Sequence, residues 1–223
     1  MQPIFGPFEA GTTEKPFCVA QLGQSLDGRI ATVTGDSKYI NGAAALDHLH
    51  AIRANVDAVV VGIGTVLADD PMLTVRRVPG RSPARVVIDP TCRLPPDAKL
   101  LADDGARRVV ICREGAWQPP PGVEAVRMPD PGAFCPREIR RILGALGFRR
   151  ILIEGGSRTI SDFVDAGALD RLHVLVAPLL IGSGKSALDL APIHRLSDAL
   201  RPAATAHLLA DGDVLFDCDL TRS

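Results

Sequence analysis

A carboxylate followed by two glycines is the most informative group in this sequence. The apolar, β-branched run at 151–153 predicts a buried strand that ends at Glu154. Gly155 and Gly156 follow, and the apolar residues of 160–164 then recur at helical spacing. Such a strand–turn–helix unit presents free backbone N–H groups and the positive end of a helix, so a phosphate is its natural ligand. The alternative is an ordinary turn between a strand and a helix.

A second unit of the same kind lies earlier in the chain. The run at 56–63 is the clearest buried strand, and the stretch GIGTVLADDP follows it. Asp69 and Asp70 precede Pro71, which disfavours helix in the residue before it, so we expect a short helical turn that ends there. Ligands of open α/β sheets bind at the carboxyl ends of the strands. This unit therefore predicts a second ligand-facing edge.

The composition restricts the class of protein. The 223 residues carry 25 basic and 26 acidic side chains, and a net charge of −1 does not suggest a surface for nucleic acid or membrane. No apolar run reaches the roughly 18 residues of a membrane span. The cysteines are odd in number and form no CxxC pair, which predicts reduced thiols in a cytoplasmic protein. The histidines are scattered, so no metal site is expected.

Strands and helices are expected to alternate along the chain. Strands are predicted at 17–22, 56–63, 85–89, 107–112, 151–153 and 171–181, and helices from Asn41 as N-cap, over 137–147 and after Gly156. The proline-rich connection at 117–132 is interpreted as a surface excursion. Asp211-Gly212 between two apolar runs predicts a C-terminal hairpin. The result is an α/β fold with a mixed sheet, in which residues 1–15 form a loose lead-in and residues 16–223 a single domain.

Six segments recur in the order of a known family. They are SLDGRIA (25–31), GDSKYI (35–40), IRANVDAVVVGIGTVLADDPMLTVR (52–76), RVVID (85–89), IEGGSRT (153–159) and APLLIGSG (177–184). Together they resemble the reductase domain of the riboflavin-biosynthesis deaminase/reductase family, over roughly residues 16–220. The resemblance implies a dihydrofolate-reductase-like fold, with a central mixed, mostly parallel sheet flanked by helices. The HxE and PCxxC motifs that a zinc deaminase needs are absent from this sequence.

The resemblance also implies a reaction and a ligand set. In that family NADPH delivers a hydride to the first ribosyl carbon of a phosphorylated ribosylaminopyrimidine, which gives the ribitylamino form. A small-molecule substrate, an NADPH cofactor and a homodimer are therefore expected. The cofactor supplies the hydride, so the protein need only position and polarise the reactants.

Individual site residues follow from the matching motifs. Positions that match cofactor-contacting residues are Gly23, Tyr39, Thr65, Asp69, Pro90 and the turn formed by Gly156, Ser157, Arg158, Thr159, Ile160, Ser161 and Asp162. Positions that match substrate-contacting residues are Ser37, Arg53, Leu73, Arg76 and Glu154. The two arginines offer forked donors suited to a phosphate. Asp69 and Glu154 are the catalytic candidates, Asp69 for proton handling or for orienting the nicotinamide ribose, and Glu154 for accepting hydrogen bonds from ring amino groups.

The sequence departs from the family pattern at two positions. Gln21 stands where members often carry lysine, and Tyr39 replaces a frequent tryptophan. A neutral amide cannot do the electrostatic work of a lysine. A reductase of the same fold that acts on dihydrofolate or another pterin is therefore an alternative, and a cofactor-binding protein without catalysis is a second one. The spacing does not separate NADPH from NADH.

Each candidate residue also has a structural explanation. Arg53 could complement a helix dipole, Asp69 and Asp70 could shape the turn before Pro71, and Glu154 could pair with a nearby arginine. The stretch IGSGKS at 181–186 invites a phosphate-loop interpretation but lacks the first glycine that such a loop requires. Ser37 could be a turn residue and Tyr39 a packing residue. Arg76 could be a solvated arginine on a strand, and His173 a core histidine.

Overall fold

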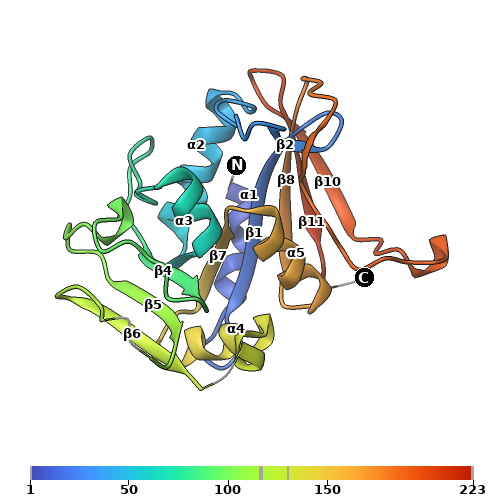
Figure 1. Ribbon diagram of the computed structural model, residues 1–223. Helices are drawn as coiled ribbons and strands as arrows, with labels where there is room; N and C mark the ends of the chain where they lie inside the picture. The colour runs from blue at the N-terminus through green and yellow to red at the C-terminus, as the bar shows by residue number, and fades with distance from the viewer. Residues whose placement is uncertain (1, 116–117, 130, 222–223) are drawn as a thin grey trace.

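One large sheet organises the computed structural model, which describes residues 2–115, 118–129 and 131–221. Positions 117 and 130 of the proline-rich connection therefore lie outside the described residues. Figure 1 shows the strands in the order β10-β11-β8-β1-β7-β3-β4-β5-β6, from the right of the view to the left. Their bounds are β1 Phe17–Ser25, β3 Ala58–Gly62, β4 Ala84–Asp89, β5 Arg108–Arg113, β6 Val123–Met128, β7 Arg150–Glu154, β8 Arg171–Ala177, β10 Ala203–Leu208 and β11 Val214–Asp219.

The strand directions confirm the predicted mixed, mostly parallel sheet. The strands from β8 across to β6 run parallel to their neighbours. β11 is antiparallel to β8, and β10 pairs with β11 as the predicted C-terminal hairpin. Gly212 has φ +92° in the hairpin turn, a conformation that glycine adopts without strain. A separate pair, β2 (Arg29–Thr32) and β9 (Gly184–Ser186), is antiparallel.

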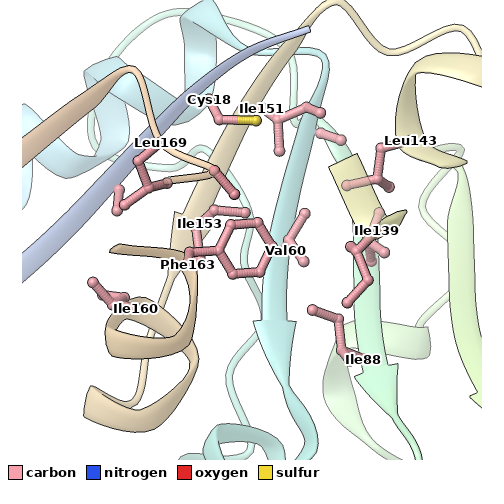
Figure 2. Close-up of a cluster of buried hydrophobic side chains, with 14 of the residues drawn as sticks. Cys18, Val60, Ile88, Ile139, Leu143, Ile151, Ile153, Ile160, Phe163 and Leu169 are labelled. Atoms are coloured by element: carbon pink, nitrogen blue, oxygen red, sulfur yellow. The ribbon is translucent and has the colours of Figure 1, made fainter. Parts of the chain in front are cut away.

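Helices cover both faces of the large sheet. The cluster on one face includes residues of α2 (Ala43–Asn55) and α3 (Ile63–Asp69), and the cluster on the other includes residues of α4 (Pro136–Ala145) and α5 (Ser157–Asp165). Side chains alternate between the two, so Cys18 faces α4 and α5 while Val19 faces α2. Figure 2 shows the α4–α5 cluster, with Phe163 and Ile139 among the side chains of the strands. The shorter helices are α1 Gln2–Phe5, η1 Gly6–Ala10, η2 Lys99–Leu101, η3 Pro131–Phe134 and η4 Leu196–Asp198.

The predicted N-cap of α2 is wrong by one residue. Gly42 is the N-cap, and its N–H donates to Asp213 Oδ2 at 2.9 Å. The N–H of Ala44 donates to Asp211 Oδ2 at 2.8 Å. Asn41 instead donates its side-chain amide to Asp213 at 3.1 Å. The helix is thus capped by carboxylates of the distant hairpin turn, which no local signal could reveal.

Two segments expected to be irregular are structured. The connection at 117–132 contains β6, which pairs with β5 at the edge of the sheet, because register with a neighbour compensates for weak local alternation. The lead-in at 1–15 carries α1 and η1 and is not loose. The Phe8 side chain is 1% exposed, and its ring lies 5.4 Å from that of Phe17 and 6.4 Å from that of His173.

Neither a membrane-spanning helix nor a metal site is found in the described ranges. No helix within 2–115, 118–129 or 131–221 is long and apolar enough to cross a membrane. Over the same ranges, no three histidine, cysteine or carboxylate side chains are grouped as a metal ion would require.

Candidate active site

The carboxyl ends of β1, β7 and β3 meet at the centre of the sheet. The chain passes from β1 to β3 and then outward to β6, returns to insert β7 between β1 and β3, and finally places β8 on the far side of β1. Strand order therefore reverses about β1 and β7, and open sheets bind ligands at such a point. Glu154 ends β7 at this edge, and the glycine turn follows it directly.

Glu154 forms a buried ion pair with Arg53 of α2. Arg53 Nε donates to Glu154 Oε2 at 2.9 Å, and Arg53 Nη2 donates to Glu154 Oε1. Arg53 Nη1 donates to the carbonyl oxygen of Thr74 at 3.0 Å. The side chains are only 6% and 13% exposed. A pairing of Glu154 with an arginine was one of the alternatives, and the partner is the distant Arg53 rather than a neighbour in sequence.

Thr65 of α3 holds the glycine turn. Gly156 N–H donates to Thr65 Oγ1 at 2.8 Å. Gly155 has φ +103°, and a Cβ at that position would lie 2.6 Å from Thr65 Oγ1. Both the conformation and the close approach thus require glycine. Two units that are separate in sequence are brought together here, and Gly156 then serves as the N-cap of α5.

A polar pocket lies beside the first turns of α5. It has a volume of about 590 Å³. Ser161 Oγ accepts a hydrogen bond from the N–H of Asp189 at 2.9 Å, which fixes the segment after β9 against the helix. Two cationic side chains border the pocket together with serines and carboxylates, and the lining residues are Ser157, Arg158, Ser161, Asp162, Lys185, Ser186 and Asp189. Phosphate groups suit this combination of a helix N-terminus, hydroxyls and cations.

The IGSG stretch is bound by a carboxylate of its own chain. Asp27 accepts hydrogen bonds from the N–H groups of Ile181 and Gly182, at 3.1 and 2.6 Å, and from the hydroxyl of Ser25 at 2.6 Å. The Ser25 hydroxyl and then the two amides lower the pKa of Asp27 to about 2. Because those amides already serve Asp27, the stretch is not a phosphate loop. The chain beyond it forms β9, whose Lys185 borders the pocket.

Arg76 lies exposed on the α2 side of the site. Its backbone N–H donates to His50 Nδ1 at 3.1 Å, and its guanidinium approaches Thr74 Oγ1 at 3.5 Å. Burial, followed by the charges of Arg53 and Arg76, lowers the pKa of His50 to about 4. Within the described ranges, no carboxylate lies within ion-pair distance of Arg76.

Leu73, Ser37 and Tyr39, three further predicted ligand contacts, differ widely in how exposed their side chains are. The Leu73 side chain is 1% exposed and packs in the core beneath α2 and α3, with φ +56°. It therefore offers its backbone rather than its side chain to a ligand. Ser37 is half-buried in the segment after β2, and Tyr39 in the same segment is 81% exposed.

The remaining cofactor candidates lie around the same strand ends. Asp69 is exposed at the last position of α3, whereas Asp70 is the C-cap of that helix and accepts a hydrogen bond from the N–H of Lys99 at 2.9 Å. Pro90 follows the last residue of β4. Gly23 leaves room for Asn41, whose Oδ1 would lie 1.9 Å from a Cβ at position 23.

Four residues at the site were not among the expected ligand contacts, namely Gln21, Lys185, Ser186 and Asp189. Lys185 and Ser186 reach it only because β9 folds back beside α5. Gln21 had a signal in the sequence, since it is a polar residue inside the apolar run FCVAQL. Its side chain is 7% exposed, and its Oε1 atom has no hydrogen-bond partner among the described residues.

The sheet order, the terminal hairpin and the glycine turn at the reversal point together define a dihydrofolate-reductase-like α/β protein. Dihydrofolate reductase from Enterococcus faecalis superposes with a TM-score of 0.52 over 91% of this chain and 96% of that one, at 13% identity, which shows the fold alone. The family model described as RibD C-terminal domain matches residues 16–210, and the chain belongs to that family.

Relatives of known name are consistent with this assignment. The 2,5-diamino-6-ribosylamino-4(3H)-pyrimidinone 5′-phosphate reductase of Methanothermobacter thermautotrophicus is 36% identical over 84% of this chain and 90% of its own length. The riboflavin biosynthesis protein RibD of Aquifex aeolicus is 34% identical over 85% of this chain, which spans 54% of that longer protein. The structure of the Thermotoga maritima diaminohydroxyphosphoribosylaminopyrimidine deaminase/5-amino-6-(5-phosphoribosylamino)uracil reductase matches with a TM-score of 0.81, at 28% identity over 92% of this chain and 56% of that one.

Proposed function

We propose that this chain is an NADPH-dependent reductase that converts a phosphorylated ribosylaminopyrimidine to its ribitylamino form, in riboflavin biosynthesis. The observation that carries the proposal is the end of β7. Glu154 is the last residue of that strand, and the turn held by Thr65 begins at the next residue. One strand end therefore positions a carboxylate suited to a pyrimidine and a helix N-terminus suited to a phosphate-bearing cofactor.

The residues around α5 fit such a cofactor. The N–H groups of 157–159 precede the first intrahelical bond, which Ile160 N–H makes to Gly156 at 3.4 Å. Arg158 and Lys185 add positive charge at the same pocket. Bound NADPH would supply the hydride, and these groups would hold its phosphates. Asp69, at the end of α3, is proposed to handle a proton or to orient the nicotinamide ribose.

Arg53 and Arg76 have different roles toward the substrate: Arg53 positions Glu154, and Arg76 binds the phosphate. Both oxygens of Glu154 already accept hydrogen bonds from Arg53, which holds the carboxylate in place. A carboxylate oxygen has a second lone pair, so Glu154 can still accept a hydrogen bond from a ring amino group. Arg76 is exposed and has no carboxylate partner in the described part of the chain, so it is the better phosphate ligand of the two.

We further propose that the protein acts in the cytoplasm as a homodimer. All five cysteines are free, which agrees with a reducing compartment. Large apolar side chains are exposed on the hairpin and on the segment before it, including Leu208 at 77% and Leu196 at 79%. A second copy of the chain would cover such a surface. Light scattering on the purified protein tests the dimer, and a monomeric mass would contradict it.

The function is tested by following NADPH oxidation by the purified protein in two parallel reactions. One contains the ribosylaminopyrimidine phosphate, and the other contains dihydrofolate. Fast oxidation with the pyrimidine alone supports the proposal. Oxidation with dihydrofolate alone would contradict it and assign the site to a pterin. Binding of NADPH without turnover of either compound would support the non-catalytic alternative.

A further inference from the structure

Two cysteines that are distant in sequence meet at the carboxyl ends of β4 and β5. Cys112 lies near the end of β5 and is buried, and Cys92 is half-buried in the loop that follows β4. Both pack in the apolar cluster beneath α2 and α3, Cys112 as a buried member and Cys92 as a partly buried neighbour. The two thiols therefore lie on the same face of the sheet.

Hydrogen bonds fold the loop after β4 back over the end of β5. Strand register places Asp89 directly opposite Cys112. The N–H of Cys92 donates to the carbonyl oxygen of Asp89 at 3.3 Å, and the Cys92 thiol donates to the carbonyl oxygen of Arg113 at 3.7 Å. Arg113 directly follows Cys112 in the chain. Cys92 is thus tied, through its backbone and its side chain, to the two residues that flank Cys112 in space and in sequence.

The buried carboxylate of Asp89 fixes this loop. Its Oδ1 atom accepts a hydrogen bond from the hydroxyl of Thr91 at 3.1 Å, and its Oδ2 atom accepts one from the N–H of Leu94 at 2.8 Å. These bonds hold Cys92 at φ +54°, a conformation that is uncommon for a residue with a side chain. A disulfide forms only between thiols that the backbone already brings close, so a fixed loop favours a bond between Cys92 and Cys112.

The two thiols differ in environment. Burial, and after it the neighbouring Cys92 thiol, raises the pKa of Cys112. Cys112 is therefore protonated at neutral pH and shielded from solvent, whereas Cys92 is partly accessible. Access and thiolate character decide which thiol an oxidant attacks. Cys92 is accordingly the thiol that reacts first, and Cys112 is the one that completes the bond.

We propose that Cys92 and Cys112 form a reversible oxidation site, at which a hydroperoxide converts the two thiols into one disulfide. Cys92 Sγ attacks the peroxide, the O–O bond breaks, and the products are a Cys92 sulfenic acid and an alcohol, or water if the oxidant is hydrogen peroxide. Cys112 Sγ then forms the S–S bond, and the sulfenic hydroxyl leaves as water with the proton of Cys112. A dithiol reductant restores both thiols by exchange.

This site goes beyond the proposed function but lies next to it. Pro90, which matches a cofactor-contacting position, belongs to the same loop as Cys92. NADPH bound against Pro90 would cover the loop and hinder the approach of a peroxide to Cys92. The proposed function therefore adds one expectation, that saturating NADPH slows the oxidation.

The test compares wild type with Cys92→Ser and with the control Cys135→Ser, which removes an exposed thiol at the N-cap of α4. Each protein is treated with hydrogen peroxide, its remaining thiols are alkylated, and it is digested with trypsin without reduction. Trypsin places Cys92 in peptide 86–93 and Cys112 in peptide 109–113, so mass spectrometry identifies the linked pair directly. Melting temperatures of the untreated proteins check that the variants fold.

In wild type and in Cys135→Ser, the linked pair of peptides is expected within one chain, with loss of two hydrogens, and dithiothreitol should separate it. In Cys92→Ser the link should be absent and Cys112 should remain a thiol. Oxidation of Cys92 to a sulfinic acid without the link would overturn the inference, and so would a link only between two chains. Equal oxidation rates with and without NADPH, when the link does form, would instead contradict contact of the cofactor with this loop.

Discussion

Arg53 and Glu154 lie 101 residues apart in sequence and share one buried ion pair. Each charge depends on the other, since a single charge left in such a place keeps its desolvation cost without compensation. The sequence motifs suggested Arg53 as a phosphate ligand. The structure places its guanidinium on Glu154 and on the Thr74 carbonyl oxygen, which makes it a positioning residue in the proposed mechanism.

Replacing Arg53 by alanine should lower the free energy of unfolding by about 3–5 kcal/mol, because Glu154 would be left buried and unpaired. Urea denaturation measures the change. The control is Arg77→Ala, which removes a partly exposed ion pair with Asp47 and should cost less than about 1 kcal/mol. Equal losses in the two variants would show that burial of the Arg53 pair has no energetic consequence.

Replacing Arg76 by alanine should weaken binding of the phosphorylated substrate by about 1.5–3 kcal/mol, the usual range for a hydrogen bond to a charged group. NADPH affinity should not change. Steady-state kinetics and a cofactor titration measure the two effects. Arg77→Ala is again the control, since Arg77 is the next residue but already pairs with Asp47. Unchanged Michaelis parameters in Arg76→Ala would exclude the phosphate role.

In the turn between β7 and α5, the nearby Thr65 side chain leaves little room for any residue larger than glycine at position 156. A Cβ at Gly156 would lie 3.2 Å from Thr65 Oγ1, so a branched side chain there must displace Thr65 or the turn. Gly156→Val is therefore expected to weaken NADPH binding and to spare binding of the ribitylamino product. Fluorescence titration with NADPH and calorimetry with the product measure the two affinities.

The control for that substitution is Gly6→Val, at the start of η1. A Cβ at Gly6 would meet no heavy atom within 4 Å, so the added side chain has open space. This variant should leave both affinities as in wild type. An NADPH affinity for Gly156→Val equal to that of wild type would mean that the turn is only a structural connection between β7 and α5.

The contact between Asp27 and the 181–182 amides should depend on pH. The pKa of Asp27 is about 2 in the folded protein against an ordinary value of 3.8, so the folded state favours the carboxylate. The contribution is complete above about pH 4 and is lost as the pH falls through about 2. Hydrogen exchange of Ile181 and Gly182 should be slower in wild type than in Asp27→Asn at pH 5. That difference should shrink at pH 2, and a constant difference would contradict the assignment.

At the scale of the whole molecule, buried histidines join the N-terminal segment, α2 and the C-terminal hairpin. His48 lies 3.2 Å from His173, which in turn lies 3.3 Å from Asp217, and the His48 ring stacks on Phe5. Burial, and then the neighbouring His173, lowers the pKa of His48 to about 3. Asp217 opposes that shift without reversing it.

Stability should therefore rise with pH between about 3 and 6.5. The unfolded chain binds a proton at His48 over this interval and the folded chain does not, so the free energy of unfolding should change by up to about 1.4 kcal/mol per pH unit. Urea denaturation between pH 4.5 and 7.5 measures the slope. His48→Gln should reduce the slope and leave the contribution of His50, whose pKa is also lowered, to about 4, whereas the exposed His194, replaced in the same way, should leave it unchanged. An equal slope in all three proteins would contradict the role of His48.

Local pattern was sufficient for the elements that are regular on their own. The apolar runs of β3, β4, β5 and β7 and the stripe of α4 appear where they were expected. Their apolar residues form a run or recur at helical spacing within one short segment, so the pattern can be recognised locally. The strand β6 and the lead-in were missed because their order comes from neighbours. β6 depends on pairing with β5, and the lead-in depends on the ring contacts of Phe8.

The sequence by itself determined the α/β class, the glycine turn after Glu154 and the family to which these motifs belong, because each is encoded within a short stretch of chain. Only the tertiary structure decided which groups meet. Thr65 and Gly156 are 91 residues apart, and β1 places Gln21 in register with Glu154. Long-range register and packing set these contacts, and a periodic pattern specifies the face a residue occupies but not the partner that it meets there.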